Sequence, residues 1–191
     1  YKIVTMGPAA SGGIVLLQTL NIMENFDLKE SGHNSADTIH ILSEAMQRAF
    51  ADRAKYHGDP DFYDVPVSEM LNKEYSKERA LTIGNKRSKD GEIYPGDIKK
   101  YDESPDTTHY SIIDSYGNAV SNTYTLGSSF GSGVTVSKGG FLMNNQMRNF
   151  SHFYGTEENT FGSSEANRLE PGKRMISTQT PTLVFDKDDN L

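Results

Sequence analysis

The first eighty residues carry hydrophobic side chains at the three- and four-residue spacing of amphipathic helices. One helix is predicted over residues 14–26, after Ser11-Gly12-Gly13, and a shorter one over residues 68–81. The longest predicted helix covers residues 35–56. Its apolar positions form a single stripe that we expect to be buried, made of Ile39, Leu42, Met46, Ala49 and Phe50.

The hydrophobic periodicity disappears between residues 83 and 106. This stretch is rich in Gly, Pro and charged side chains of both signs, which is typical of turns and loops. It is long for a loop inside a compact domain, and such loops are commonly functional or open to cleavage. We therefore interpret it as an exposed connector.

After the connector, alternating and β-branched residues predict strands. A hairpin is expected from residues 108–114 and 119–126, with Tyr116-Gly117-Asn118 as its turn. Further short strands are predicted at residues 134–137, 140–144 and 181–185. Helices followed by a run of strands favour an α+β layered domain over a parallel βαβ sheet.

Composition narrows the possible functions. The 191 residues are 35% hydrophobic and 24% charged, as in soluble globular proteins, and no apolar run reaches membrane-spanning length. The formal net charge of −7 disfavours a nucleic-acid partner, because phosphate binding requires a basic face. Because the chain contains no cysteine, disulfides, thiolate catalysis and cysteine metal sites are excluded.

Two histidines invite a chemical interpretation. His40 and Glu44 lie one helical turn apart, but without a third ligand nearby a solvated pair is favoured over a metal site. His109 shares a strand face with residue 107 without bringing the two side chains into hydrogen-bond contact, so it is interpreted as structural. No metal and no cofactor are expected.

The hairpin also brings threonines together. If Asp114 pairs with Ala119 across the turn, antiparallel register places Thr125 opposite Thr108 and beside Thr107. Threonine pairs across strands are usually structural, because threonine favours strands in general. The residues alone therefore leave open whether Thr125 is structural or places a functional hydroxyl beside Thr107.

Several segments, in the same order along nearly the whole chain, carry a resemblance to a known family. One group runs from residue 106 to residue 147: Asp106-Thr107-Thr108-His109-Tyr110-Ser111, Gly117-Asn118-Ala119-Val120, Thr123-Tyr124-Thr125-Leu126, Phe130-Gly131 and Asn144-Asn145-Gln146-Met147. These resemble the start of the small subunit of γ-glutamyltranspeptidases. Others resemble the end of that family's large subunit, or its next substrate-binding segment: Ser11-Gly12-Gly13, Ala51-Asp52-Arg53, Gly58-Asp59-Pro60-Asp61-Phe62, Gly172-Lys173-Arg174 and Pro181-Thr182.

The resemblance implies an N-terminal threonine nucleophile at Thr107, exposed when the precursor cleaves itself after Asp106. A threonine hydroxyl is a poor nucleophile unless a base accepts its proton. A freed α-amine, whose unperturbed pKa is about 7.7–8.0, can be that base on the same residue. By the same resemblance, Thr125 hydrogen-bonds the nucleophile and orients it.

The resemblance also implies a binding site for the donor. Gln146 matches the position that helps to bind the donor's α-amino group, and Ser177 one of two serines that hold its α-carboxylate. Thr178 stands where the second serine is usual and keeps the hydroxyl. Asn149 stands where an aspartate normally pairs with the α-ammonium, so a γ-glutamyl donor is expected to bind about ten- to a hundredfold more weakly, or a different donor is used.

Two further positions depart from the family pattern. Gly127 occupies a position that is often asparagine, and Phe161 is the candidate for a lid tyrosine that contacts the usual aspartate in some members.

We therefore expect an αββα layered sandwich of the N-terminal-nucleophile hydrolase type, present in part. Residues 1–106 would be the end of the large subunit and residues 107–191 the start of the small one, the two forming a heterodimer. Both ends of the sequence look cut. The arginine that usually grips the donor carboxylate and the oxyanion glycines would lie outside it, so the fragment alone is expected to be inactive.

The expected function is γ-glutamyl transfer or hydrolysis, with glutathione or a similar donor and water, an amino acid or a peptide as acceptor. Family resemblance implies a periplasmic or extracellular location. The alternatives are a related amidase or acylase with the same Thr107 chemistry, and an uncleaved, inactive homologue that acts as a binding protein.

Overall fold

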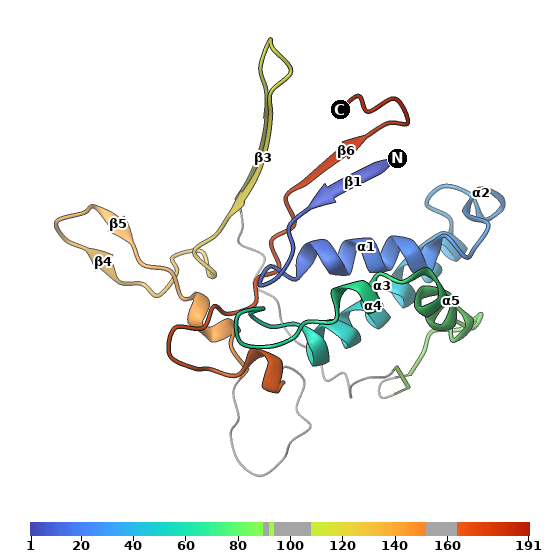
Figure 1. Cartoon of the computed structure of the whole chain (residues 1–191), viewed down its shortest axis with the longest axis horizontal. Coiled ribbons are helices and arrows are strands. Elements are labelled where there is room, and N and C mark those ends of the chain that lie inside the picture. The colour runs from blue at the N-terminus through green and yellow to red at the C-terminus, as the bar shows by residue number, and fades with distance from the viewer. Residues whose placement is uncertain (90–91, 94–107, 152–163) are drawn as a thin grey trace.

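The computed structural model describes residues 1–89, 92–93, 108–151 and 164–191. Helices α1 (Gly12–Met23), α3 (Ala36–Tyr56) and α5 (Lys73–Leu81) lie together, and two hairpins extend away from them (Figure 1). Two short helices, α2 (Leu28–Ser31) and α4 (Val67–Met70), complete the helical part. Helices and paired strands together make an α+β protein, as the sequence predicts.

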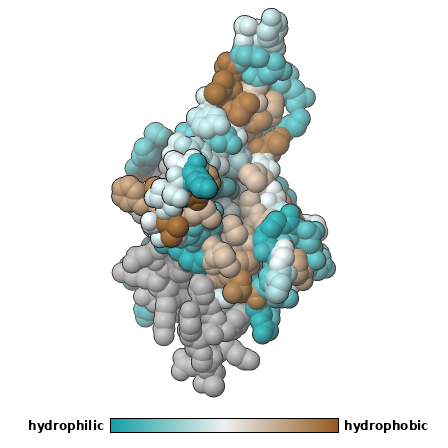
Figure 2. Space-filling view, turned by 90° about the vertical axis from the view of Figure 1, so that its left-hand side faces the viewer, coloured by the Kyte–Doolittle hydropathy of each residue, from teal (hydrophilic) through white to brown (hydrophobic). Residues whose placement is uncertain are grey.

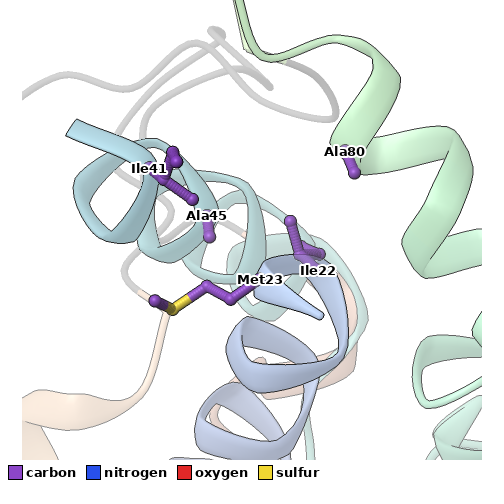
Figure 3. Packing of buried hydrophobic residues seen from close by; sticks show 5 residues of the cluster. All are labelled: Ile22, Met23, Ile41, Ala45 and Ala80. Atoms are coloured by element: carbon purple, nitrogen blue, oxygen red, sulfur yellow. The ribbon is translucent and has the colours of Figure 1, made fainter. Parts of the chain in front are cut away.

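The hydrophobic core lies where α1, α3 and α5 meet. Figure 3 shows its buried cluster, made of Ile22, Met23, Ile41, Ala45 and Ala80. Fully burying one of the larger aliphatic side chains contributes about 1.5–3 kcal/mol to stability, so this small cluster fixes how the three helices pack.

The predicted apolar stripe of α3 is largely wrong. The helix spans the predicted residues, and Ser35 caps it by accepting a hydrogen bond from the Thr38 N–H at 3.1 Å. However, Ile39, Leu42 and Met46 are exposed, and of the stripe only Ala49 is buried. The buried face of α3 instead combines one isoleucine, three alanines and three charged residues: Ile41, Glu44, Ala45, Arg48, Ala49, Ala51 and Asp52.

The interpretation of His40 and Glu44 as a solvated pair is also wrong. The Glu44 carboxylate is buried, pairs with Arg48 Nη1 at 2.7 Å and accepts a hydrogen bond from the Ser88 N–H at 2.9 Å. Burial alone would raise its pKa, but the hydrogen bonds from Ser88 and Arg48 hold it below the ordinary value. His40 turns away to Gly84, with 2.7 Å between its Nε2 and the Gly84 main-chain oxygen.

A second buried carboxylate, Asp52, joins all three long helices. It accepts hydrogen bonds from Gln18 of α1 and from the Tyr75 hydroxyl of α5 at 2.9 Å, and pairs with Arg79 at 3.2 Å. Its burial nevertheless raises its pKa above the ordinary value, against the opposing charge of Arg79. Such a group is costly to leave unpaired, so these partners specify the packing of the helices.

The predicted helix over residues 68–81 is two helices. The break falls at Asn72, whose side chain accepts hydrogen bonds from the N–H groups of Glu74 at 2.8 Å and Tyr75 at 3.3 Å. This is an N-cap, which starts α5 anew after α4.

The two ends of the sequence lie side by side. Strand β1 (Lys2–Thr5), which the sequence pattern does not predict, pairs antiparallel with β6 (Thr182–Phe185), which it does (Figure 1). The segment after β1 leads into α1, so the β1–β6 pair holds residues near 180 beside the start of that helix.

The predicted hairpin forms from β2 (Thr108–Ile113) and β3 (Ala119–Tyr124), but its register differs by one residue. Ala119 pairs with Ile113 and Tyr124 with Thr108. The turn is one residue longer than expected, because the Asp114 carboxylate accepts the N–H groups of Tyr116 and Asn118, both at 2.9 Å. Figure 2 shows hydrophobic side chains on the surface of this hairpin. The exposed large side chains of its two strands are Tyr110, Ile112, Ile113, Val120 and Tyr124.

A second hairpin joins β4 (Thr135–Val136) to β5 (Phe141–Leu142), within the two ranges that the sequence predicts. Two 3-10 turns follow, η1 (Gln146–Asn149) and η2 (Glu165–Asn167). In the described ranges the strands form three two-stranded sheets, and no helix there is long and apolar enough to cross a membrane.

Candidate active site

Three of the residues that the sequence singles out, Asp106, Thr107 and Phe161, lie outside the described residues. Thr125 is described. It follows the last residue of β3, is half-buried, and its Oγ1 accepts a hydrogen bond from the Gly127 N–H at 2.9 Å. The hydroxyl of Thr125 therefore has a fixed direction at the end of the strand.

Polar side chains continue from Thr125 along one face of the hairpin. His109 contacts the Thr123 hydroxyl through Nδ1 at 2.7 Å and the Ser111 hydroxyl through Nε2 at 3.1 Å. Ser121, paired with Ser111, accepts the Thr182 N–H at 3.0 Å and so ties the hairpin to the start of β6. These bonds support the structural interpretation of His109.

The loop after β3 packs against the residues that precede η1. Asn145 accepts the Ser128 N–H at 3.0 Å and donates to the Ser128 hydroxyl at 2.9 Å. Gly127 has φ +96°, and a Cβ placed on it would lie 2.0 Å from Asn145 Oδ1. The left-handed backbone at this position, where the resemblance leads one to expect asparagine, favours glycine, and Asn145 packs into the space that a Cβ would take.

Gln146 and Asn149, the first and last residues of η1, are joined by a hydrogen bond between their side chains. The Asn149 Nδ2 donates to Gln146 Oε1 at 2.7 Å and to the Ile176 main-chain oxygen at 3.3 Å. Both side chains are neutral amides, so this part of the site offers hydrogen bonds to a ligand but no negative charge.

The segment that contains Ser177 and Thr178 lies next to η1. Asn167, only 3% exposed, donates from Nδ2 to the Asn149 main-chain oxygen at 2.7 Å and accepts the Ile176 N–H at 3.1 Å. The structure therefore brings together all four predicted donor-binding residues, Gln146, Asn149, Ser177 and Thr178, as neighbours on two adjoining segments.

Ser177 is held from the other side by residues near the start of the chain. Its main-chain oxygen accepts hydrogen bonds from both the N–H and the hydroxyl of Ser11, at 2.7 and 2.8 Å. The Ser11 hydroxyl in turn accepts a hydrogen bond from Arg53 Nε at 2.8 Å. A Cβ on Gly12 would lie 2.5 Å from the Thr178 main-chain oxygen, so the glycine after Ser11 is what lets the two segments touch.

Two ionisable side chains, those of His57 and Asp59, have shifted pKa values. Burial and the neighbouring Arg53 lower the pKa of His57 to about 4, so this histidine is neutral at physiological pH. Asp59 is buried, and its carboxylate accepts hydrogen bonds from the main-chain N–H of Arg174 at 2.7 Å and from the Arg174 Nε at 2.9 Å. These hydrogen bonds hold the pKa of Asp59 far below the ordinary value.

The supporting residues Ser11, Arg53, Asp59, Asn167 and Arg174 have no predicted role from the sequence pattern. Four of them lie in the segments that carry the family resemblance, which is the signal that could have pointed to them. Among the described residues, no three His, Asp or Glu side chains are grouped closely enough to hold a metal ion.

Comparison with known proteins agrees with these features. The profile of the family described as Gamma-glutamyltranspeptidase matches residues 1–191. The glutathione hydrolase proenzyme of Escherichia coli (strain K12) is 46% identical over 187 residues, which are 96% of this chain and 32% of that protein. The proenzyme of the same name from Pseudomonas aeruginosa is 48% identical over 180 residues, which are 92% of this chain and 31% of that protein.

A solved structure matches the fold. The crystal structure of cephalosporin acylase from Bacillus halodurans matches with a TM-score of 0.76 and 30% sequence identity. The match covers 98% of this chain and 31% of the acylase chain. The chain thus spans about a third of the length of the curated relatives it matches. Because the family profile covers every residue, the chain belongs to the gamma-glutamyltranspeptidase family.

Proposed function

We propose that this chain is part of an enzyme precursor that transfers or hydrolyses γ-glutamyl groups, with glutathione or a related compound as donor. The observation that carries the proposal is the meeting of two segments, Gln146 with Asn149 and Ser177 with Thr178, in a chain with up to 48% identity to glutathione hydrolase proenzymes. Water, an amino acid or a peptide would be the acceptor.

In the proposed mechanism Thr107 is the nucleophile. Its hydroxyl first attacks the carbonyl of Asp106, which breaks the amide bond, frees the α-amine of Thr107 and leaves Asp106 as an ester on the Thr107 oxygen. Water then hydrolyses this ester, which separates the two chains and restores the hydroxyl. In turnover the hydroxyl adds to the γ-carbonyl carbon of the donor, and its proton passes to the α-amine. The leaving amine departs with that proton, and water or an acceptor amine then attacks the ester and restores the hydroxyl.

Thr125 is proposed to orient this nucleophile. The observed register pairs Tyr124 with Thr108, so Thr125 directly follows the last paired residue of β3. Its Oγ1 accepts a hydrogen bond from the Gly127 N–H at 2.9 Å, which gives the hydroxyl a fixed direction and supports an orienting role.

The donor's α-carboxylate is proposed to bind the hydroxyls of Ser177 and Thr178, and its α-ammonium to bind near Gln146 and Asn149. The ammonium would meet amide oxygens in place of a carboxylate. A charge-assisted hydrogen bond contributes about 1.5–3 kcal/mol, so binding of a γ-glutamyl donor would be weaker by roughly one to two orders of magnitude than with aspartate at position 149.

The finer architecture is part of the proposal. The similarity to the cephalosporin acylase structure, at a TM-score of 0.76, supports an αββα layered sandwich completed by other parts of a longer protein. Cleavage after Asp106 would make residues 1–106 and 107–191 parts of two subunits of a heterodimer. A location outside the cytoplasm is an expectation from family resemblance.

A second candidate is an acylase that uses the same threonine chemistry on a donor without an α-ammonium. Two observations favour it: the neutral Asn149 in the ammonium site, and the similarity in fold to a cephalosporin acylase. A donor with no positive charge would lose nothing from the absence of a carboxylate at position 149.

A panel of donors tests both candidates on the full-length protein. The kcat/KM values for a γ-glutamyl anilide and for glutaryl anilide, which lacks only the amine, are compared. Higher kcat/KM for the γ-glutamyl anilide supports the first candidate, and the reverse order supports the acylase. A protein that cleaves neither donor and keeps its chain intact would instead be the inactive homologue.

A further inference from the structure

The side chain of Asn167 bridges the two segments of the proposed donor site. Its Nδ2 donates to the main-chain oxygen of Asn149 at 2.7 Å, and its Oδ1 accepts the main-chain N–H of Ile176 at 3.1 Å. One contact therefore reaches the end of η1, and the other reaches the residue directly before Ser177.

The bridge itself is held in place by its backbone. The N–H of Ser151 donates to the Asn167 main-chain oxygen at 2.9 Å, and the Asn167 N–H donates to Ser164 at 3.1 Å. With 3% of the residue exposed, water does not compete for the amide of Asn167. Its two side-chain hydrogen bonds, at 2.7 and 3.1 Å, are shorter than the direct hydrogen bond between the segments, from Asn149 Nδ2 to the Ile176 main-chain oxygen at 3.3 Å. Asn167 thus supplies two of these three hydrogen bonds, which together set the distance between η1 and the 176–178 segment.

An asparagine suits this position chemically. The bridge must donate at one end, to a carbonyl, and accept at the other, from an N–H, and a primary amide does both in one plane. An ionised aspartate has nearly the same shape, but it only accepts. It would keep the contact with the Ile176 N–H and set a negative oxygen against the Asn149 carbonyl.

The chemistry of the donor explains why the spacing matters. In a γ-glutamyl group the α-ammonium and the α-carboxylate are attached to the same carbon. The groups that bind them, Gln146 with Asn149 on one segment and Ser177 with Thr178 on the other, must therefore stay at one fixed separation. We propose that Asn167 is a positioning residue that fixes this separation and so sets the affinity for the donor, without touching the donor itself. This inference rests on the proposed function.

The test is Asn167→Asp in the full-length protein, with the γ-glutamyl anilide as donor. We expect the KM of the donor to rise about tenfold or more, because small misplacements of binding groups have effects of this size, while kcat stays within about twofold. Asn21→Asp is the matched control. Asn21 also donates from its amide to a main-chain oxygen, that of Leu71 at 3.1 Å, but this contact joins α1 to the residue after α4. It is expected to leave KM unchanged.

A double-mutant cycle separates positioning from a general loss of stability. In a Gln146→Ala background, Asn167→Asp is expected to raise KM by a clearly smaller factor, because one of the groups that it positions is already gone. Equal factors in both backgrounds, or an unchanged KM for Asn167→Asp alone, would overturn the proposal.

Crystal structures of the wild-type and Asn167→Asp proteins give a readout that does not depend on turnover. The proposal predicts that η1 and the 176–178 segment move apart in the variant, and an unchanged separation would overturn it. If the wild-type protein cleaves no γ-glutamyl donor, it is the proposed function that fails, and the crystal structures alone then decide whether Asn167 sets the spacing.

Discussion

The main-chain oxygen of Ser177 accepts two hydrogen bonds from Ser11, one from its N–H at 2.7 Å and one from its hydroxyl at 2.8 Å. The two residues are on opposite sides of the proposed cleavage site after Asp106. A residue of the proposed large subunit thus contacts a proposed donor-binding residue of the proposed small subunit. The proposed donor site would therefore depend on both halves of the precursor.

Ser11→Ala is expected to weaken donor binding, because it removes the hydroxyl bond to Ser177 and the acceptor of Arg53 Nε. A neutral hydrogen bond contributes about 0.5–1.5 kcal/mol, which corresponds to a rise of roughly two- to tenfold in the KM of the donor. Ser68→Ala, which removes an exposed hydroxyl bonded to Glu69, is the control. A fall in kcat without any change in KM would show that Ser11 does not act through Ser177.

Asp59→Asn is expected to destabilise the protein in a pH-dependent way. Hydrogen bonds from Arg174 lower the pKa of Asp59 in the folded state, so its carboxylate stabilises the fold above the unfolded pKa of about 3.9. This contribution is lost as the pH falls toward the folded pKa. The wild-type protein should therefore have a higher free energy of unfolding than the variant at pH 7, by about 2 kcal/mol.

Urea unfolding of both proteins between pH 7 and pH 3 provides the measurement for Asp59. The difference in the free energy of unfolding should be constant down to about pH 5 and shrink below it. A difference that does not depend on pH would mean that the negative charge of Asp59 is not what stabilises the fold.

Thr107→Ala is expected to abolish both self-cleavage and turnover, because one hydroxyl serves both reactions. Thr125→Ala should slow both by roughly 10²-fold or less and leave the fold intact, since Thr125 orients the nucleophile without attacking. Gel analysis of the precursor and anilide turnover measure the two effects. Wild-type turnover in the Thr107→Ala protein would require a different nucleophile.

Asn149→Asp is expected to restore a carboxylate for the donor's α-ammonium. The kcat/KM for a γ-glutamyl anilide should rise, by up to about a hundredfold, while the value for glutaryl anilide should not. The gain will be reduced to the extent that Arg148, the adjacent residue, pairs with the new carboxylate. Equal effects on the two donors would show that position 149 does not face the ammonium.

The sequence predicted those parts of the molecule that local patterns determine. Helix α3 falls within the predicted residues 35–56, because its start depends on a local contact, the hydrogen bond from the Thr38 N–H to the Ser35 hydroxyl. The buried face of α3 was not predictable in this way, because the partners of Glu44 and Asp52, among them Ser88, Gln18 and Tyr75, come from distant segments.

The same distinction applies to the candidate site. Resemblance predicts four donor-binding residues, and the structure places them on adjoining segments. The hydrogen bonds of Asn167 to Ile176 and of Ser11 to Ser177 are contacts between residues distant in the sequence, which no periodicity reveals. The predicted hairpin register was wrong by one residue, because the turn is lengthened by hydrogen bonds that the Asp114 carboxylate accepts from Tyr116 and Asn118.

The most direct test of the proposed chemistry is the N-terminal sequence of the smaller product of the full-length protein. Cleavage between Asp106 and Thr107 predicts two chains on a denaturing gel, and a smaller chain that begins Thr-Thr-His-Tyr. An N-terminus at any other residue, or a single intact chain in a preparation that cleaves the γ-glutamyl anilide, would contradict both the processing step and Thr107 as the nucleophile.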